Sequence, residues 1–249
     1  MKVFFHEDFY QVYTSDPAAA KGRMEAVVKT IEPWVEMVSA EPADHDDVAA
    51  VHSPLHIRHV QDAGLYPIAI LAAGGAVQAA NQGLTEPGFG LIRPPGHHAS
   101  ADTSWGFCYF NNMAVAIESL KCEQKIETAY ILDIDLHYGD GTVNILENQS
   151  YVTVHNVEAM NRDAYMREAD DAMARCRSDI IAISAGFDNH LDDWGGVLAT
   201  EDYYDIGKMV KAAADRNNGG CFAVLEGGYN HDVLGKNVLA LIQGLSDAK

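Results

Sequence analysis

The chain has 249 residues, 48% of them hydrophobic, and a formal net charge of −19 at pH 7. This length supports one substantial core, so we expect a single domain over residues 1–249. The acidic charge argues against a nucleic-acid backbone or an anionic membrane surface as the partner, because both need clustered Lys and Arg. A neutral or cationic substrate fits more easily, although many cytosolic enzymes are acidic merely for solubility.

Cysteine spacing and the N-terminal sequence indicate the compartment. The cysteines stand far apart with no CxxC pair, which excludes a disulfide scaffold and a zinc ribbon; they are Cys108, Cys122, Cys176 and Cys221. The N-terminal "MKVFFHEDFY" reaches polar and charged residues too early for a signal peptide. No apolar run approaches the roughly 18 residues of a membrane span. We therefore expect a cytoplasmic protein with reduced thiols.

Short apolar runs alternate with longer segments of helical spacing. The expected strands are "KVFF", "GFGLI", "TAYILDI", "YVTVH", "DIIAISAG" and "CFAVLEGG". The expected helices cover about residues 20–38, 54–82, 111–121, 163–176 and 202–218, and "EPADHDD" (41–47) is expected to link a helix to a short strand. Apolar strands that alternate with helices are typical of an α/β domain with a parallel sheet covered on both faces.

A glycine pair lies inside the second expected helix, in "AAGGAVQAA" (72–80). Glycines of this kind occur in phosphate-binding loops, but such loops follow a strand, and none precedes this segment. Close packing of the helix against a neighbour is the better interpretation.

Polar residues cluster where the expected strands end. "GFGLI" runs into RPPGHH, "YILDI" into DLHYGDG, "IAISAG" into FDNHLDD, and "FAVL" into EGGYN. In open parallel sheets the ligand site lies beyond the carboxyl ends of the strands. These four segments are therefore expected to form one site.

The segment "LDIDLHYGD" offers ligands for a metal. Asp133, Asp135 and His137 alternate, so an extended chain would direct all three to one face. Asp188 ends a second apolar strand. Solvated loop carboxylates are the simpler alternative, but two carboxylates and one imidazole suit zinc or a related transition metal that activates water.

Two adjacent histidines, His97 and His98, follow the stiff turn Pro94-Pro95-Gly96. Asp140, and whichever of Asp133 and Asp135 is not a ligand, can accept the ring N–H groups and raise their basicity. This arrangement suits proton transfer beside an activated water. The alternative is that the histidines only stabilise the turn.

Tyr229 follows two glycines behind another apolar strand. A phenol at this place can donate a hydrogen bond to an oxyanion opposite the metal, which would lower the barrier for acyl transfer by several kcal/mol. Taken alone, the residue is better explained as a packing residue, and the functional interpretation rests on the whole set of residues.

Five ordered motifs carry a family resemblance: RPPGHHA, GFCYFNNMAVA (106–116), ILDIDLHYGDGT (131–142), SAGFDNHLDD (184–193) and EGGYN (226–230). They resemble the successive motifs of the histone deacetylase and acetylpolyamine amidohydrolase superfamily, and "VHSPLHIRHV" (51–60) matches loosely. The resemblance covers most of the chain from about residue 90 onward. It implies an arginase-like three-layer α/β/α fold with about eight mostly parallel strands, forming one deacetylase-like catalytic domain.

The resemblance also implies roles for individual residues. A catalytic Zn²⁺, or Fe²⁺ with the same ligands, would be held by Asp135, His137 and Asp188. Catalysis would involve the His97–Asp133 and His98–Asp140 pairs and Tyr229, with His98 favoured as the main acid and base and His97 as electrostatic support. Substrate contacts would come from Gly106, Phe107, Gly227 and Gly228. A structural K⁺ would lie near Asp133, Asp135, His137, Thr153 and Val154.

The chain departs from the family pattern in three places. Position 138 is Tyr where the family commonly has a second His, which should not affect metal binding. Only about thirty residues separate His155 from Asp188, where the family has a longer loop with an aromatic wall. The pocket is therefore expected to be shallower or wider than in a histone deacetylase, with Phe107 as its one recognisable wall and Met160 as a partial substitute for the other. The segment 61–75 is also short, which puts recognition of a peptide backbone in doubt.

The sequence thus favours a zinc-dependent deacetylase that acts on acetylpolyamine, acetyl-lysine or another small acylated amine. An arginase-like ureohydrolase is disfavoured because "DIDLH" has the opposite order to DxHxD and a second ligand set is missing. A degenerate binding module of the same fold stays an alternative, although such proteins usually lose a catalytic His or Tyr. The oligomeric state stays open.

Overall fold

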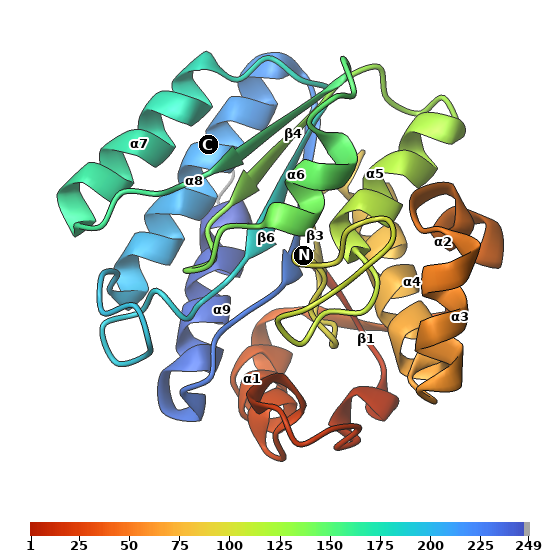
Figure 1. The fold of residues 1–249 in the computed structure, drawn as a ribbon. Helices are drawn as coiled ribbons and strands as arrows, with labels where there is room; N and C mark the ends of the chain where they lie inside the picture. Colours follow the sequence, from red (N-terminus) through yellow and green to blue (C-terminus); the bar gives the residue numbers. More distant parts are fainter. Residues whose placement is uncertain (247–249) are drawn as a thin grey trace.

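The computed structural model describes residues 1–246, and within them seven parallel strands form one sheet in the order β2-β1-β3-β7-β6-β4-β5 (Figure 1). The strands are β1 (Lys2–Phe5), β2 (Glu36–Ser39), β3 (Gly88–Gly90), β4 (Ala129–Asp133), β5 (Val152–Asn156), β6 (Ile180–Ala185) and β7 (Gly220–Leu225). The α/β class with a parallel sheet is confirmed, with seven strands against the expected eight or so.

Helices cover both faces of this sheet. They are α1 (Arg23–Ile31), α2 (His45–Val51), α3 (Pro54–Asp62), α4 (Tyr66–Gly83), α5 (Asn112–Cys122), α6 (Asp140–Leu146), α7 (Arg162–Arg175), α8 (Thr200–Asn217) and α9 (His231–Ser246). Helices α7 to α9 lie on one side, with α1 against α9, and α2 to α5 lie on the other (Figure 1). None of these helices has both the length and the apolar character that a membrane crossing requires.

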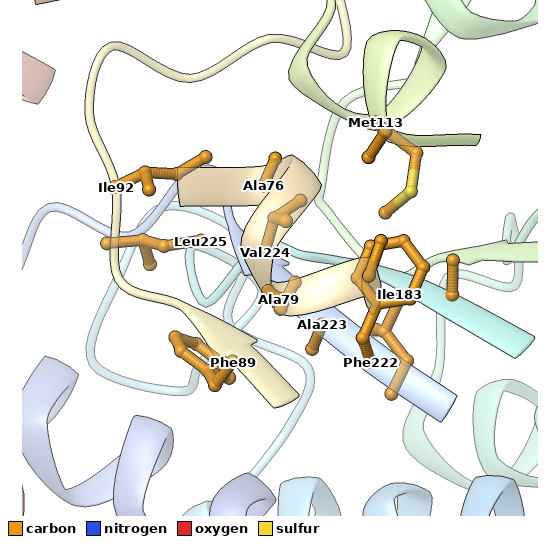
Figure 2. Close-up of a cluster of buried hydrophobic side chains, with 14 of the residues drawn as sticks. Ala76, Ala79, Phe89, Ile92, Met113, Ile183, Phe222, Ala223, Val224 and Leu225 are labelled. Carbon is orange, nitrogen blue, oxygen red and sulfur yellow. The ribbon is translucent and has the colours of Figure 1, made fainter. Parts of the chain in front are cut away.

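The core lies where α4 packs on the centre of the sheet. Ala76 and Ala79 of α4 lie over β7, whose residues from Cys221 to Leu225 are buried (Figure 2). A Cβ atom on Gly74 would come within 1.9 Å of the Glu41 carbonyl oxygen, and one on Gly75 within 2.6 Å of Ile92. The glycine pair of α4 therefore permits close packing, as the sequence indicated.

Several expected element boundaries were wrong. The expected helix 20–38 ends earlier: α1 stops at Ile31, a 3-10 turn follows (Glu32–Trp34), and residues 36–39 form β2. As an edge strand that pairs only with β1, β2 is half-exposed and lacks a continuous apolar run. The segment 41–47 leads into helix α2 instead of a strand.

The expected helix 54–82 is two helices, α3 and α4. They are separated at Gly64, whose φ of 74° is a left-handed conformation that glycine adopts readily. Helices α6 and α9 were not expected. Helix α6 begins inside the motif ILDIDLHYGDGT and α9 directly after EGGYN, and both motifs were interpreted only as parts of the site.

Candidate metal and active site

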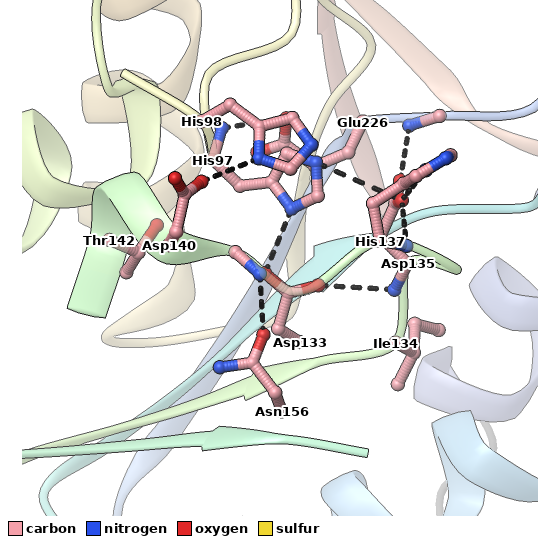
Figure 3. Close-up of polar contacts among 12 residues, drawn as sticks. His97, His98, Asp133, Ile134, Asp135, His137, Asp140, Thr142, Asn156 and Glu226 are labelled. Atoms are coloured by element: carbon pink, nitrogen blue, oxygen red, sulfur yellow. Dashed lines mark hydrogen bonds and ion pairs between the residues drawn. The ribbon is translucent and has the colours of Figure 1, made fainter. Parts of the chain in front are cut away.

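Four neighbouring strands bring the polar motifs together. Strands β3, β7, β6 and β4 are adjacent and parallel, so the segments that follow them leave the same edge of the sheet. Figure 3 shows the resulting cluster of imidazoles and carboxylates. The expectation that these segments meet at one place agrees with the geometry.

Asp135, His137 and Asp188 form a group that can hold a metal ion. The Nδ1 atom of His137 lies 3.2 Å from Asp135 Oδ1 and 3.2 Å from Asp188 Oδ2, and one ligand atom of each residue lies within 4.8 Å of the others. Asp135 Oδ2 accepts a hydrogen bond from Gly227 N at 2.8 Å, and Asp188 Oδ1 accepts one from Leu136 N at 3.0 Å. Backbone donors thus orient both buried carboxylates.

The electrostatics of this group favour a cation. Asp188 Oδ2 is buried and, within residues 1–246, has no hydrogen-bond partner apart from its charged contact with His137 Nδ1 at 3.2 Å. Burial, and then the charge of Asp135, raise the pKa of Asp188 to about 6, while hydrogen bonds to both carboxylates raise the pKa of His137 to about 10. A divalent cation would neutralise this excess negative charge, and two carboxylates with one imidazole fit Zn²⁺ or Fe²⁺.

The two adjacent histidines each contact their own carboxylate. His97 Nδ1 lies 3.1 Å from Asp133 Oδ2, and His98 Nδ1 lies 2.7 Å from Asp140 Oδ1 (Figure 3). Burial alone disfavours charge on His97, but Asp135 and Asp133 outweigh it and hold the pKa of His97 well above its ordinary value. Burial and the charge of His97 lower the pKa of His98 to about 4. At neutral pH His98 is therefore the neutral imidazole of the pair.

The turn that carries the histidines is held by Glu226, which the sequence analysis did not select. Its Oε2 atom accepts hydrogen bonds from Gly96 N at 2.7 Å and from His97 N at 3.3 Å. Burial raises the pKa of Glu226 to about 7. The signal was available, because this Glu opens the EGGYN motif at the end of β7.

A cavity of about 110 Å³ lies above this cluster. It is lined by Pro95, His97, His98, Trp105, Gly106, Phe107, His137, Trp194, Gly227 and Tyr229. Trp105 lies against His98 with ring centroids 3.8 Å apart and the ring planes tilted by 30°, and Trp194 stacks on Tyr229 at 4.0 Å. Phe107 is thus one of several aromatic walls, and the expectation of a single recognisable wall was wrong. Both tryptophans adjoin quoted motifs, at their ends, where spacing gave no reason to select them.

Met160 does not line this cavity. It borders a second one of about 190 Å³, together with Tyr138 and Tyr165, which reaches Asp135 and His137 from another side. Two cavities therefore approach the metal group. The idea that Met160 replaces the missing aromatic wall is wrong, since it faces the second cavity.

The glycines of the site make room for its side chains. A Cβ atom on Gly227 would come within 2.5 Å of Asp135 Oδ2, and one on Gly106 within 2.3 Å of the His98 ring. Gly228 has a φ of 114° and faces Phe187. Gly106 and Gly227 line the cavity, whereas Gly228 serves the packing beneath it.

The residues expected around a K⁺ ion are not all brought together. Thr153 pairs with Tyr130 and Val154 with Ile131, whereas Asn156 is the residue paired with Asp133. With a rise of about 3.3 Å per residue, Thr153 lies three positions below Asp133 along the sheet. Only Asp133, Asp135 and His137 of that predicted set lie in one place.

Known proteins resemble this chain over most of its length. The protein-family model for the histone deacetylase domain matches residues 62–165 and 157–245 of this chain. A probable deacetylase of Methanothermobacter thermautotrophicus is 28% identical over 98% of this chain and 90% of that protein. A histone deacetylase-like amidohydrolase of Pseudomonas aeruginosa is 30% identical over 86% of this chain and 72% of that protein.

The comparisons also show that a relative has segments that this chain lacks. The alignment to the Methanothermobacter protein spans 302 positions, more than the 249 residues of this chain, so that relative carries segments with no counterpart here. The two family matches overlap at residues 157–165, within the stretch where the sequence indicated a shortened loop. The crystal structure of the HDA15 HD domain has the same fold, with a TM-score of 0.84 at 22% identity over 98% of this chain and 88% of that one. This chain belongs to the histone deacetylase family.

Proposed function

We propose that the protein is a metal-dependent amidohydrolase that removes the acetyl group from an N-acetylated amine. One observation carries the proposal: a group of side chains that could hold a metal ion, two carboxylate-paired histidines and a tyrosine meet at one cavity. The names of the relatives, deacetylase and amidohydrolase, describe the same reaction class.

Asp135, His137 and Asp188 would hold Zn²⁺ or Fe²⁺. When bound, the metal would polarise the acyl carbonyl and lower the pKa of water, so that hydroxide forms near neutral pH. The buried Oδ2 of Asp188, whose partner within residues 1–246 is His137, and the raised pKa of Asp188 support a cation at this place.

His98 is the residue best prepared to accept the proton of the attacking water. Its imidazole is neutral at pH 7, and its Nδ1 atom is hydrogen-bonded to Asp140. Its Nε2 atom is therefore the one that can accept the proton. His97 keeps its proton and provides a positive charge beside the developing negative charge. Return of the proton from His98 to the leaving nitrogen then releases a neutral amine.

Tyr229 would donate a hydrogen bond to the carbonyl oxygen. Burial, and then the charges of Asp135 and Asp188, raise the pKa of this phenol, so it keeps its proton at neutral pH. A donor fixed at the site of a developing oxyanion contributes about 2.7–4 kcal/mol to catalysis.

The substrate class follows from the cavity and the charge. A cavity of about 110 Å³ with aromatic walls suits a small acyl group and the methylene chain beside it. The net charge of −19 suits an amine substrate such as an acetylpolyamine or an acetyl-lysine side chain, in the cytoplasm, and disfavours nucleic acid and membrane partners.

The test is an assay of acetate release by protein stripped of metal and reloaded with Zn²⁺ or Fe²⁺. The substrates would be acetylpolyamines, acetyl-lysine peptides and small acyl amides, with Tyr229→Phe as the control. Urea release from guanidino substrates would be measured separately for the ureohydrolase alternative. We expect one acetylated amine to be hydrolysed only by the reloaded protein, with about 10²-fold less activity in Tyr229→Phe. Tight metal binding without hydrolysis of any amide would favour a non-catalytic module.

A further inference from the structure

The loop after Asp188 is folded tightly on itself. Gly195 N donates a hydrogen bond to the carbonyl oxygen of Asp188 at 2.7 Å, and Trp194 N donates one to Asp193 Oδ1 at 2.9 Å. A Cβ atom at position 195 would come within 2.5 Å of the Asn189 side-chain oxygen, so this turn requires glycine. The turn therefore fixes Trp194 a short distance from the cation-binding carboxylate.

The same loop holds the backbone of Tyr229. Asp193 Oδ2 accepts hydrogen bonds from Tyr229 N and Asn230 N, each at 2.8 Å, and Asn230 Nδ2 donates to the Asp192 carbonyl oxygen at 2.6 Å. Hydrogen bonds to an ionised carboxylate are roughly twice as strong as neutral ones. The segment that supplies Asp188 is thus tied directly to the segment that supplies the phenol.

The Trp194 ring contacts both parts of the site. It stacks on the Tyr229 ring at 4.0 Å and 24°, and it meets the His137 ring edge-on at 6.1 Å and 90°. Trp194 is 53% exposed and Tyr229 is half-buried, so the indole lies on the solvent side of the stack. A stacked ring on one face limits the side-chain rotations of a tyrosine that has no other aromatic cover on that face.

We propose that Trp194 is the positioning residue of Tyr229 and the outer wall of the substrate cavity. This inference rests on the proposed function and deepens it, because the stack would hold the phenol where the carbonyl oxygen is to be polarised. Phe107 meets the Tyr229 ring edge-on at 6.0 Å, so the phenol lies between two aromatic contacts, of which Trp194 is the stacked one.

A double-mutant cycle tests the proposal on the metal-loaded, full-length protein. Trp194→Ala is expected to lower kcat by up to about 100-fold, as displacement of a catalytic group by about 1 Å does. In a Tyr229→Phe background the same change should have little further effect on kcat, because the group that Trp194 positions is already gone. Trp194→Phe should restore much of kcat, since it keeps an aromatic face.

Two controls distinguish a loss of Tyr229 positioning from a general disruption of the fold. Trp34→Ala changes another exposed tryptophan, outside the site, and should leave kcat and KM unchanged. Zinc stoichiometry in Trp194→Ala should equal that of the wild type, which shows that the loop still presents Asp188. An increase in KM with unchanged kcat, or additive losses of kcat in the double-mutant cycle, would overturn the positioning role. Trp194 would then be only a wall of the substrate cavity.

A crystal structure of Trp194→Ala makes this inference independent of the proposed activity. If the wild type hydrolyses no amide, the proposed function fails, but the inference still requires the Tyr229 phenol to leave its place or lose its order in the variant. A phenol in the same place with the same order would contradict the inference, whatever the activity of the wild type.

Discussion

Trp105 donates its indole N–H to Asp140 Oδ2 at 2.8 Å and lies over the imidazole of His98, the residue that contacts the other oxygen of the same carboxylate. The indole thus supports His98 twice, by stacking on its ring and by orienting its carboxylate. The interaction lies at the mouth of the cavity, where Trp105 is 54% exposed. Such outer contacts decide how well a proton acceptor is aligned.

The first prediction concerns this indole. Trp105→Phe keeps an aromatic ring on His98 but removes the hydrogen bond to Asp140, and we expect kcat/KM to fall by roughly 10-fold. Trp105→Ala removes both contacts and should lower kcat/KM by nearer 100-fold. Steady-state kinetics on the best acetylated amine measures both values, with Trp34→Phe as the matched control. Equal activity of Trp105→Ala and the wild type would show that the indole is only a surface residue.

The two histidines should differ in their pH profiles. His98→Ala removes the proton acceptor, and kcat should fall by roughly 10²–10⁴-fold. His97→Ala should cost less, and because it removes a positive charge beside His98, the pKa of His98 should rise from about 4 toward its ordinary value. The acid limb of kcat/KM, which requires neutral His98, should therefore move to higher pH. Equal losses with unchanged profiles in the two variants would refute this division of roles.

Metal loading should stabilise the fold. A ligand that binds only the folded state at 100 times its Kd adds about 2.7 kcal/mol. For a chain of this size that corresponds to an increase in Tm of roughly 5–10 °C. Differential scanning fluorimetry of chelator-treated protein with and without Zn²⁺ measures this increase. His137→Ala should lose most of it; an undiminished increase would place the zinc elsewhere.

Without metal, stability should depend on the protonation of Asp188. Its folded pKa of about 6 lies above the ordinary value near 3.9, so the folded chain binds the proton more tightly than the unfolded chain does. The associated stability is fully present below about pH 4 and is lost as the pH rises through about 6. The Tm of metal-free protein should therefore fall by several degrees between pH 5 and 7.

Two carboxyl-to-amide variants isolate this effect. Asp188→Asn should flatten the Tm profile between pH 5 and 7, because the titrating group is gone. Asp192→Asn, in the same loop but exposed, should retain the slope of the wild type. If Tm changes with pH by the same slope in the wild type and in both variants, the pH dependence belongs to another group.

Local sequence predicted the parts of the site that follow buried strands. The apolar runs of β4 and β6 are unmistakable, and the alternation of Asp133, Asp135 and His137 after β4 needs only strand geometry to place it. Individual histidine and carboxylate partners could be assigned with the help of the family resemblance. The edge strand β2 was not predicted, because an exposed edge strand needs no continuous apolar sequence.

The aromatic walls could not be predicted because they depend on contacts between distant loops. Trp105 and Trp194 are half-exposed and stand at the ends of separate motifs, so neither periodicity nor spacing marks them. Only the folded chain shows that one covers His98 and the other Tyr229. The shortened stretch after His155 predicts a missing loop with an aromatic wall, and an indole from another loop lies beside the phenol.

The most direct measurement is the appearance of free acetate from an N-acetylated amine, followed by ¹H NMR with metal-free wild type, zinc-loaded wild type and zinc-loaded His98→Ala. Acetate and free amine should form in equal amounts with the zinc-loaded wild type, and hydrolysis should be lost without metal and reduced at least roughly 100-fold in His98→Ala. Acetate formation at the same rate in all three samples, or in none of them across the substrate panel, would contradict amide hydrolysis at this site.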